Sequence, residues 1–313
     1  MSRSNADAAP VLIAAFEGWN DAAGAASDAA QFLLRACNAV EIWSVDPERY
    51  FDFQAARPSV EIVNGVTRSL RWPSISVHRG SAPRTGREIV FVVGPEPNLQ
   101  WPRLCAEILD LARPRGVGTV VTLGALLGDA PHTRPLPVTG TANDTDTIER
   151  LGLRRSSYEG PTGIVGVFAE AARRAGFDTA SLWVPVPHYV SSAPCPKATL
   201  ALLERLARLL DLDIELRNLV EAAQHWEAEV NTVLETDGDL IEYVHQLEHR
   251  FDNDLSDDWA ADDDAEWFDD DDEWDDESDW DDDTDRIAEA DLPSGETLAA
   301  DFERYLREHG DDT

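Results

Sequence analysis

The feature that most constrains the fold of this chain is a run of acidic residues near its C-terminal end. Residues 252–283 contain 20 Asp and Glu residues and no Lys or Arg, so the run carries a charge of −20. It interleaves tryptophans with the acids but has few aliphatic side chains. Self-repulsion and so little apolar surface cannot offset the entropy lost on folding. We therefore expect residues 252–292 to form a disordered, acidic, Trp-containing linker and residues 1–251 to hold the folded domain.

The remaining charge excludes two classes of partner. The 313 residues have a formal charge of −35, of which only −9 falls on residues 1–251. Nucleic acid needs a surface of Lys and Arg to neutralise its phosphates, and anionic lipid attracts the same residues, so we expect no nucleic acid and no membrane as partner. No apolar run approaches the ~18 residues that cross a bilayer, and residues 1–10 lack the pattern of a signal peptide. We expect a cytoplasmic protein.

The sequence carries no recognised cofactor or metal motif. Cys37, Cys105 and Cys195 lie far apart and outside any CxxC pattern, which indicates reduced, buried thiols rather than a zinc site. His245 and His249 have the i, i+4 spacing that can bind a metal on one helical face, but no obvious third ligand accompanies them. The chain also has no phosphate loop, GxGxxG, GxSxG or HExxH pattern. We therefore expect no metal and no cofactor.

Residues 10–251 alternate between short apolar runs and amphipathic stretches. This alternation is typical of a mostly parallel sheet covered by helices on both faces, an α/β fold. The expected strands are residues 11–16, 40–45, 88–93, 117–123 and 181–186. The expected helices are an Ala-rich segment ending near Cys37, residues 99–112, 143–150 and 162–175, and a helical C-terminal part (about 196–251) made of 197–210, 213–234 and 238–251.

Two segments differ from this alternation. Asn64-Gly65 lies between the alternating stretches 60–63 and 66–72, a strong signal for a β-hairpin inserted into the α/β series. An amphipathic C-terminal helix is expected at residues 293–309, beyond the linker. Its apolar stripe consists of Leu298, Phe302, Tyr305 and Leu306.

Polar and aromatic side chains follow several of the expected strands or precede a helix. In open α/β sheets, ligands bind beyond the carboxyl ends of the strands, so these residues are candidates for a ligand pocket or for acid/base chemistry. No catalytic residue can be chosen among them. The candidates are Glu17, Trp19, Asn20, Asp21, Glu96, Asn98, His132, Arg134, Tyr158, Glu159, Thr162, His188 and Tyr189.

The same residues also have structural interpretations. Asn20 and Thr162 are suited to capping helices, and His132 to hydrogen bonding within a Pro-rich loop. Arg134 with Glu96 or Glu159 would form an ion pair that fixes the loops. The sequence leaves these alternatives open.

Several long strings resemble the actinobacterial branch of the proteasome-assembly-chaperone-2 family, over residues 11–252. They are AFEGWNDAAGAAS (15–27), YFDFQAARP (50–58), GPEPNLQW (94–101), TLGALLGDAPHTRPLPVTGTA (122–142), SYEGPTGIVG (157–166), LWVPVPHYVSSAPCPKATLALL (182–203) and YVHQLE (243–248). The resemblance implies a three-layer sandwich similar to the nucleoside-phosphorylase-like fold. It also implies self-assembly as a homotrimer and a link to proteasome subunits as partners.

The resemblance favours a non-enzymatic, self-associating chaperone that binds protein. The alternative is an enzyme or small-ligand-binding protein that uses the polar strand-end residues, because some relatives carry a carboxylate-amine ligase label. Archaeal relatives linked to the proteasome end in a hydrophobic-Tyr-any tail, whereas this sequence ends in Gly310-Asp311-Asp312-Thr313. The resemblance therefore implies no docking through a tail of that kind.

Overall fold

The structure is a computed structural model that describes residues 9–63, 67–142, 154–155, 160–190, 194–234 and 238–257. They all belong to one compact unit, residues 1–260, whereas the second unit, residues 261–313, lies outside the described residues. The acidic segment from residue 258 onward, the helix expected at 293–309 and the helix expected at 143–150 therefore lie outside them too and stay predictions.

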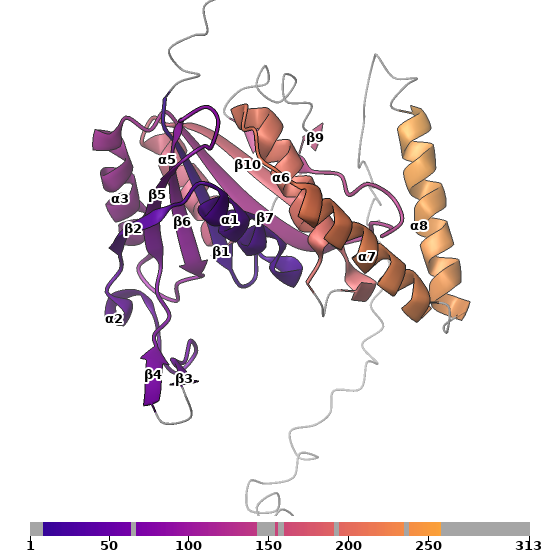
Figure 1. Cartoon of the computed structure of the whole chain (residues 1–313), viewed down its shortest axis with the longest axis horizontal. Helices are drawn as coiled ribbons and strands as arrows, with labels where there is room; N and C mark the ends of the chain where they lie inside the picture. The colour runs from indigo at the N-terminus through magenta and orange to yellow at the C-terminus, as the bar shows by residue number, and fades with distance from the viewer. Residues whose placement is uncertain are drawn as a thin grey trace, which may run out of the picture. The chain divides into compact units, whose positions relative to one another are not determined.

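An eight-stranded sheet forms the centre of the described unit (Figure 1). Its four inner strands run parallel, and antiparallel strands join them on both sides. This arrangement confirms the expected α/β class. In spatial order the strands are β2 (Val40–Ser44), β5 (Ser76–Ser81), β6 (Glu88–Pro95), β1 (Val11–Glu17), β7 (Thr119–Gly128), β10 (Asp178–Pro187), β8 (Thr139–Ala142) and β9 (Arg154–Arg155).

Helices cover both faces of the sheet, as the continuous apolar strands require. Side chains of β1 alternate between two cores: Val11 and Ile13 belong to one, Leu12 and Ala14 to the other. The first core is closed by α1 (Ala25–Ala36) and α6 (Pro196–Leu210), and the second by α3 (Trp101–Ala112) and α5 (Ile164–Arg174). The expected three-layer sandwich is therefore confirmed.

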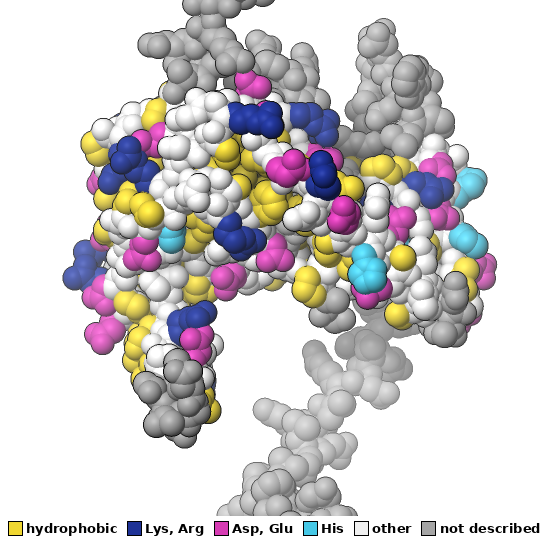
Figure 2. All heavy atoms as spheres, viewed as in Figure 1, with side chains coloured by type: hydrophobic (Ala, Val, Ile, Leu, Met, Phe, Trp, Pro, Cys, Tyr) yellow, Lys and Arg dark blue, Asp and Glu magenta, His cyan; other side chains and the backbone are white. Residues whose placement is uncertain are grey.

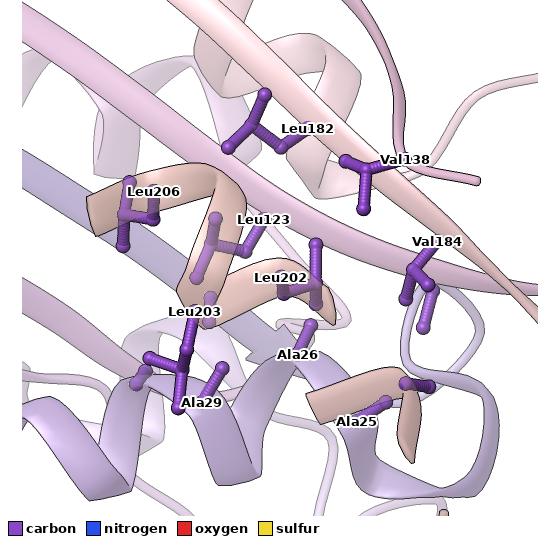
Figure 3. Close-up of a cluster of buried hydrophobic side chains, with 14 of the residues drawn as sticks. Ala25, Ala26, Ala29, Leu123, Val138, Leu182, Val184, Leu202, Leu203 and Leu206 are labelled. Carbon is purple, nitrogen blue, oxygen red and sulfur yellow. The ribbon is translucent and has the colours of Figure 1, made fainter. Parts of the chain in front are cut away.

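The first core depends on small residues in α1. Ala25, Ala26 and Ala29 are fully buried against the leucines of α6, and side chains of β7 and β10 complete the cluster (Figure 3). Alanine lets two helices approach closely, so Leu203 can fill the space between them and the sheet. Two more helices, α7 (Arg217–Leu234) and α8 (Gly238–Asp257), extend the chain beyond α6, and α7 adds the buried Trp226 to this core.

The inserted hairpin is confirmed. Strands β3 (Ser59–Val63) and β4 (Thr67–Arg71) pair antiparallel, and they form a two-stranded sheet of their own, separate from the central one. The hairpin follows β2 and the short helix α2 (Pro47–Tyr50), and it projects away from the central sheet (Figure 1).

Three elements differ from the sequence-based expectations. Strand β7 continues past Leu123 to Gly128, because Gly124 leaves room for the ring of Trp183; a Cβ at Gly124 would lie 2.5 Å from that ring. The expected strands do not include β8, nor β5, which follows the hairpin.

Helix α8 also continues past its expected end at Phe251, to Asp257. Asp252 accepts two hydrogen bonds from Arg134, at 2.9 and 2.8 Å. The acidic run therefore begins inside this helix, where its first carboxylate is neutralised by an arginine of the α/β unit.

We predict that Leu203→Ala lowers the free energy of unfolding by about 2–5 kcal/mol, because the cavity left between α1 and α6 cannot collapse onto side chains as small as alanine. Leu99→Ala, at a leucine that is 46% exposed, should cost less than about 1 kcal/mol. Chemical denaturation monitored by circular dichroism measures both. Equal losses would contradict the packing described for α6.

Candidate functional site

Glu96 joins the ends of two strands to the start of a helix. One oxygen of its carboxylate, Oε1, accepts hydrogen bonds from the Asn20 side-chain amide at 3.2 Å and from the Ile164 backbone N–H at 2.8 Å. Gly163 leaves the space for this contact, since a Cβ there would lie 2.0 Å from Asn20 Nδ2. A carboxylate on the first N–H groups of α5 both satisfies a free donor and favours the helix dipole.

Asp21 accepts hydrogen bonds from the first turn of α1 in the same way. Its Oδ1 accepts from the backbone N–H groups of Ala26 at 2.7 Å and Ser27 at 3.1 Å. Burial raises the pKa of Asp21, and burial together with the charge of Asp21 raises the pKa of Glu17 and of Asp28. These three carboxylates, which we call the acidic edge, repel one another beside the end of β1.

His132 is the centre of a second polar group, in the loop after β7. Its side chain is 1% exposed, and its Nε2 lies 2.9 Å from Asn231 Oδ1 while its Nδ1 lies 2.9 Å from the Tyr189 hydroxyl. The carbonyl oxygen of Asn231 can only accept, which assigns the ring proton to Nε2. Nδ1 then accepts the hydroxyl proton of Tyr189, and that hydroxyl in turn accepts from the His132 backbone N–H.

Charged pairs extend this group to the C-terminal helices. Arg134 contacts Asp252 through two nitrogens and Glu248 at 3.2 Å. Lys197, the single lysine of the chain, pairs with Glu227 and donates to the backbone carbonyl of His132. These contacts fasten α6, α7 and α8 to the loop, so most of the group's hydrogen-bonding capacity is used inside the molecule.

Two further candidates lie at the margins. His188 Nδ1 is 3.3 Å from Asp129, and the Tyr243 hydroxyl donates to the same carboxylate at 3.2 Å. Asn98 lies elsewhere, where its side-chain oxygen accepts from the Asp52 backbone N–H at 3.0 Å.

The structure thus divides the candidate residues into separate groups. Glu17, Asn20, Asp21 and Glu96 gather at the ends of β1 and β6, and a second group gathers around α7 and α8. Arg134, His132, His188 and Tyr189 form that second group. Tyr158 and Glu159 lie outside the described residues. Whether these residues bind a ligand stays a prediction.

Several residues that contact the second group or its neighbours could not be found from strand ends. Asn231, Glu227, Tyr243 and Glu248 come from helices, where a polar residue usually indicates only a solvated face. The one available signal was the string YVHQLE, which contains Tyr243 and Glu248 and belongs to the family resemblance.

A cavity of about 1010 Å³ lies beside the first group. It opens between the loop after β1, the end of β7, strands β8 and β10, and helix α5. The chain leaves β1 through α1 on one face of the sheet and reaches β7 through α3 on the other, and such switch points are where open sheets form crevices. Among the candidate residues that the structure describes, only Trp19, Asn20 and Thr162 line it; Leu126, Leu127 and Trp183 are further lining residues.

Comparison with known proteins decides the family. Residues 15–234 match the sequence model described as PAC2 family. The chain belongs to the PAC2 family. Among solved structures, a PAC2 family protein from Streptomyces avermitilis is 46% identical, with 75% of this chain and 99% of that chain covered and a TM-score of 0.70.

Two other solved structures extend the comparison of this PAC2 chain. A proteasome-assembly chaperone homologue from Mycobacterium tuberculosis is 45% identical, with 75% of this chain and 99% of that chain covered and a TM-score of 0.70. An archaeal proteasome activator from Pyrococcus furiosus is 17% identical, with 72% and 93% covered and a TM-score of 0.57, a likeness of fold alone. No curated protein matches the chain.

Two features are absent from the parts of this PAC2 chain that the structure describes. None of the described helices is long and apolar enough to cross a membrane. The described His, Cys, Asp and Glu side chains form no group of three or more that could hold a metal ion.

We predict that protonation of His132 destabilises the protein. Burial lowers the pKa of His132 below 6.5, so the unfolded chain binds this proton at a higher pH than the folded chain. The contribution of His132 to stability is therefore complete above pH 6.5 and is lost as the pH falls below it, at up to about 1.4 kcal/mol per pH unit. Denaturant unfolding at pH 7.5 and 5.5 should show a smaller loss for His132→Gln than for wild type; an identical loss would contradict this role.

We also predict that Glu96→Ala lowers the free energy of unfolding by about 0.5–2 kcal/mol, as loss of a helix cap does. Glu96→Gln keeps an accepting oxygen in place of Oε1 and should retain most of that stability. Thermal and chemical unfolding of the two variants provide the measurement. The capping role is wrong if the alanine variant is as stable as the glutamine variant.

Proposed function

We propose that this chain acts by binding other proteins, as a self-associating and non-enzymatic assembly factor for proteasome subunits in the cytoplasm. The observation that carries the proposal is its membership of the PAC2 family, together with 45% identity to a proteasome-assembly chaperone homologue over 99% of that chain. The fold is also similar to that of an archaeal proteasome activator, which supports the same proposal.

The polar residues hold helices in place, and this structural role fits the proposal. Glu96 and Asp21 hold helix N-termini, and His132, Arg134 and Lys197 hold the C-terminal helices. Side chains used in this way give rigid loops and a fixed helical extension. Rigid surfaces favour protein binding, because less conformational entropy is lost when the complex forms.

The cysteines support the cytoplasmic part of the proposal. Within the described residues, the three cysteines are free and buried, as expected of a protein kept in a reducing compartment.

The test is reconstitution with purified proteasome subunits from the organism that carries this chain. We expect a stable complex with at least one subunit type in size-exclusion chromatography and faster formation of the core particle. An unrelated acidic protein of similar charge serves as the control, because polyanions can act on basic partners without specificity. Failure to bind any subunit, with no change in assembly rate, contradicts the proposed client.

Self-association is tested separately on the chain alone. Light scattering or sedimentation equilibrium should give three times the chain mass of 34.5 kDa for a trimer. These methods are needed because a charged segment enlarges the hydrodynamic radius without changing the mass. A mass of 34.5 kDa across micromolar concentrations would contradict self-association.

A further inference from the structure

The β3–β4 hairpin has one apolar face that nothing covers within the described residues. Val60 pairs with Leu70 across the hairpin, so these two side chains share a face with Ile62 and with Trp72, which follows β4. All four are between 45% and 66% exposed, and we call them the hairpin face. Hydrophobic side chains gather along the projecting hairpin in Figure 2.

The opposite face of the hairpin is polar. Glu61 and Arg71 lie there and form an ion pair, and Ser69 stands opposite Glu61. This alternation, interrupted by Arg68 opposite Ile62 and by Val63 opposite Thr67, is the pattern of a strand pair with one side buried and one side in water. An isolated two-stranded ribbon is marginally stable without such burial. Among the described residues, only Phe53 contacts the hairpin face through a ring pair, with its ring centroid 4.7 Å from that of Trp72.

A second uncovered apolar surface lies at the mouth of the cavity. Trp19 is 68% exposed, and Leu126 and Leu127 at the end of β7 are 45% and 52% exposed. All three line the cavity, and we call them the switch-point cleft. The other large exposed hydrophobic residues of the described unit, Val40, Leu99 and Val233, belong to neither surface.

The cleft suits side chains of a protein segment better than a small molecule. Its volume of about 1010 Å³ is at the upper limit of the ~300–1,000 Å³ typical of small-ligand sites, and its mouth is apolar. The charges also match. Residues 57–72 contain three arginines and one glutamate, a net charge of +2 on an acidic chain, and Glu17 and Asp21 of the acidic edge lie within two residues of Trp19 in the sequence.

The two surfaces lie too far apart in the strand order to cover each other within one chain. The hairpin follows β2, at one edge of the sheet, while the cleft is built on β1, β7, β10 and β8, toward the other edge. A projecting surface on one side and a concave one on the other can be joined only between copies. Such unlike surfaces produce a head-to-tail contact, which closes into a ring when the rotation between successive copies closes and otherwise forms an open filament.

We propose that the hairpin face of one copy docks in the switch-point cleft of a second copy. This assignment rests on the self-association in the proposed function and names the surfaces that carry it. The Arg-containing hairpin then meets the acidic edge of its neighbour, and each copy covers both of its apolar surfaces.

Substitution of each surface gives the first test. Ile62→Asp on the hairpin face and Leu127→Asp in the cleft should each reduce the mass measured by light scattering from that of the oligomer to 34.5 kDa. Ser69→Asp, on the polar face of the same hairpin, and Leu99→Asp, at an exposed leucine outside both surfaces, introduce the same charge and should leave the mass unchanged. Circular dichroism checks the fold, and Leu70→Asp repeats the hairpin test from the partner strand.

A mixture of the two variants tests the head-to-tail geometry. Ile62→Asp retains a working cleft and Leu127→Asp retains a working hairpin, so the mixture should form a species of two copies that grows no further. A contact between identical surfaces would not be rescued in this way.

The outcomes separate this assignment from the proposed function. A wild-type chain that is monomeric contradicts self-association itself. A wild-type oligomer whose mass neither substitution changes overturns only the assignment. If Ile62→Asp loses binding to proteasome subunits while the oligomer stays intact, the hairpin face binds a client instead. That result also overturns the assignment. The assignment is also overturned if a compound raises the melting temperature of wild type but not of Leu127→Asp, because the cleft would then be a small-molecule site.

Discussion

Burial of β1 on both of its faces is the constraint on which the rest of the unit depends. Its side chains supply two separate cores, so each face needs its own pair of helices. The pairing of β1 with β6 and β7 fixes where the loops after these strands emerge, and Ala125 donates to the carbonyl of Asn20 at 2.8 Å to hold the first loop against β7. The cavity at the switch point follows from this one central strand.

Polar residues then help to fix the positions of helices α7 and α8. Helix α7 contributes few buried side chains, and the hydrogen bonds and ion pairs around His132 set its position and that of α8. Buried polar networks of this kind add specificity of arrangement more than stability, because desolvation offsets much of what each pair gains. The helical extension is thus held both by apolar side chains such as Trp226 and Val244 and by this polar network.

Most of the fold could be predicted from the sequence because apolar periodicity and turn chemistry agree along the chain. The strands at 11–16 and 88–93, the hairpin around Asn64-Gly65 and the helix ending at Leu210 all follow from local pattern. The errors occurred where a distant partner overrides a local signal. Gly124 resembles a strand end in sequence, yet Trp183 from β10 needs its missing Cβ, and α8 continues into the acidic run because Arg134 is near.

The candidate site was less predictable for the same reason. Residues at strand ends could be named, but sequence does not say that Glu96 caps α5 or that Arg134 pairs with α8 rather than with Glu96. The alternation of Val60, Glu61 and Ile62 indicates a strand with one apolar side but does not say what covers that side. That the central sheet does not cover it is a result of topology.

The single lysine has a practical consequence for labelling chemistry. Lys197 is 15% exposed and is held by Glu227 and by the carbonyl of His132, so the one side-chain amine of the chain is poorly available to amine-reactive dyes and cross-linkers. The three native thiols are buried. Introduced cysteines on this background would therefore be nearly the sole reactive side chains for thiol reagents, whereas coupling to side-chain amines would report little beyond local opening of the contacts around Lys197.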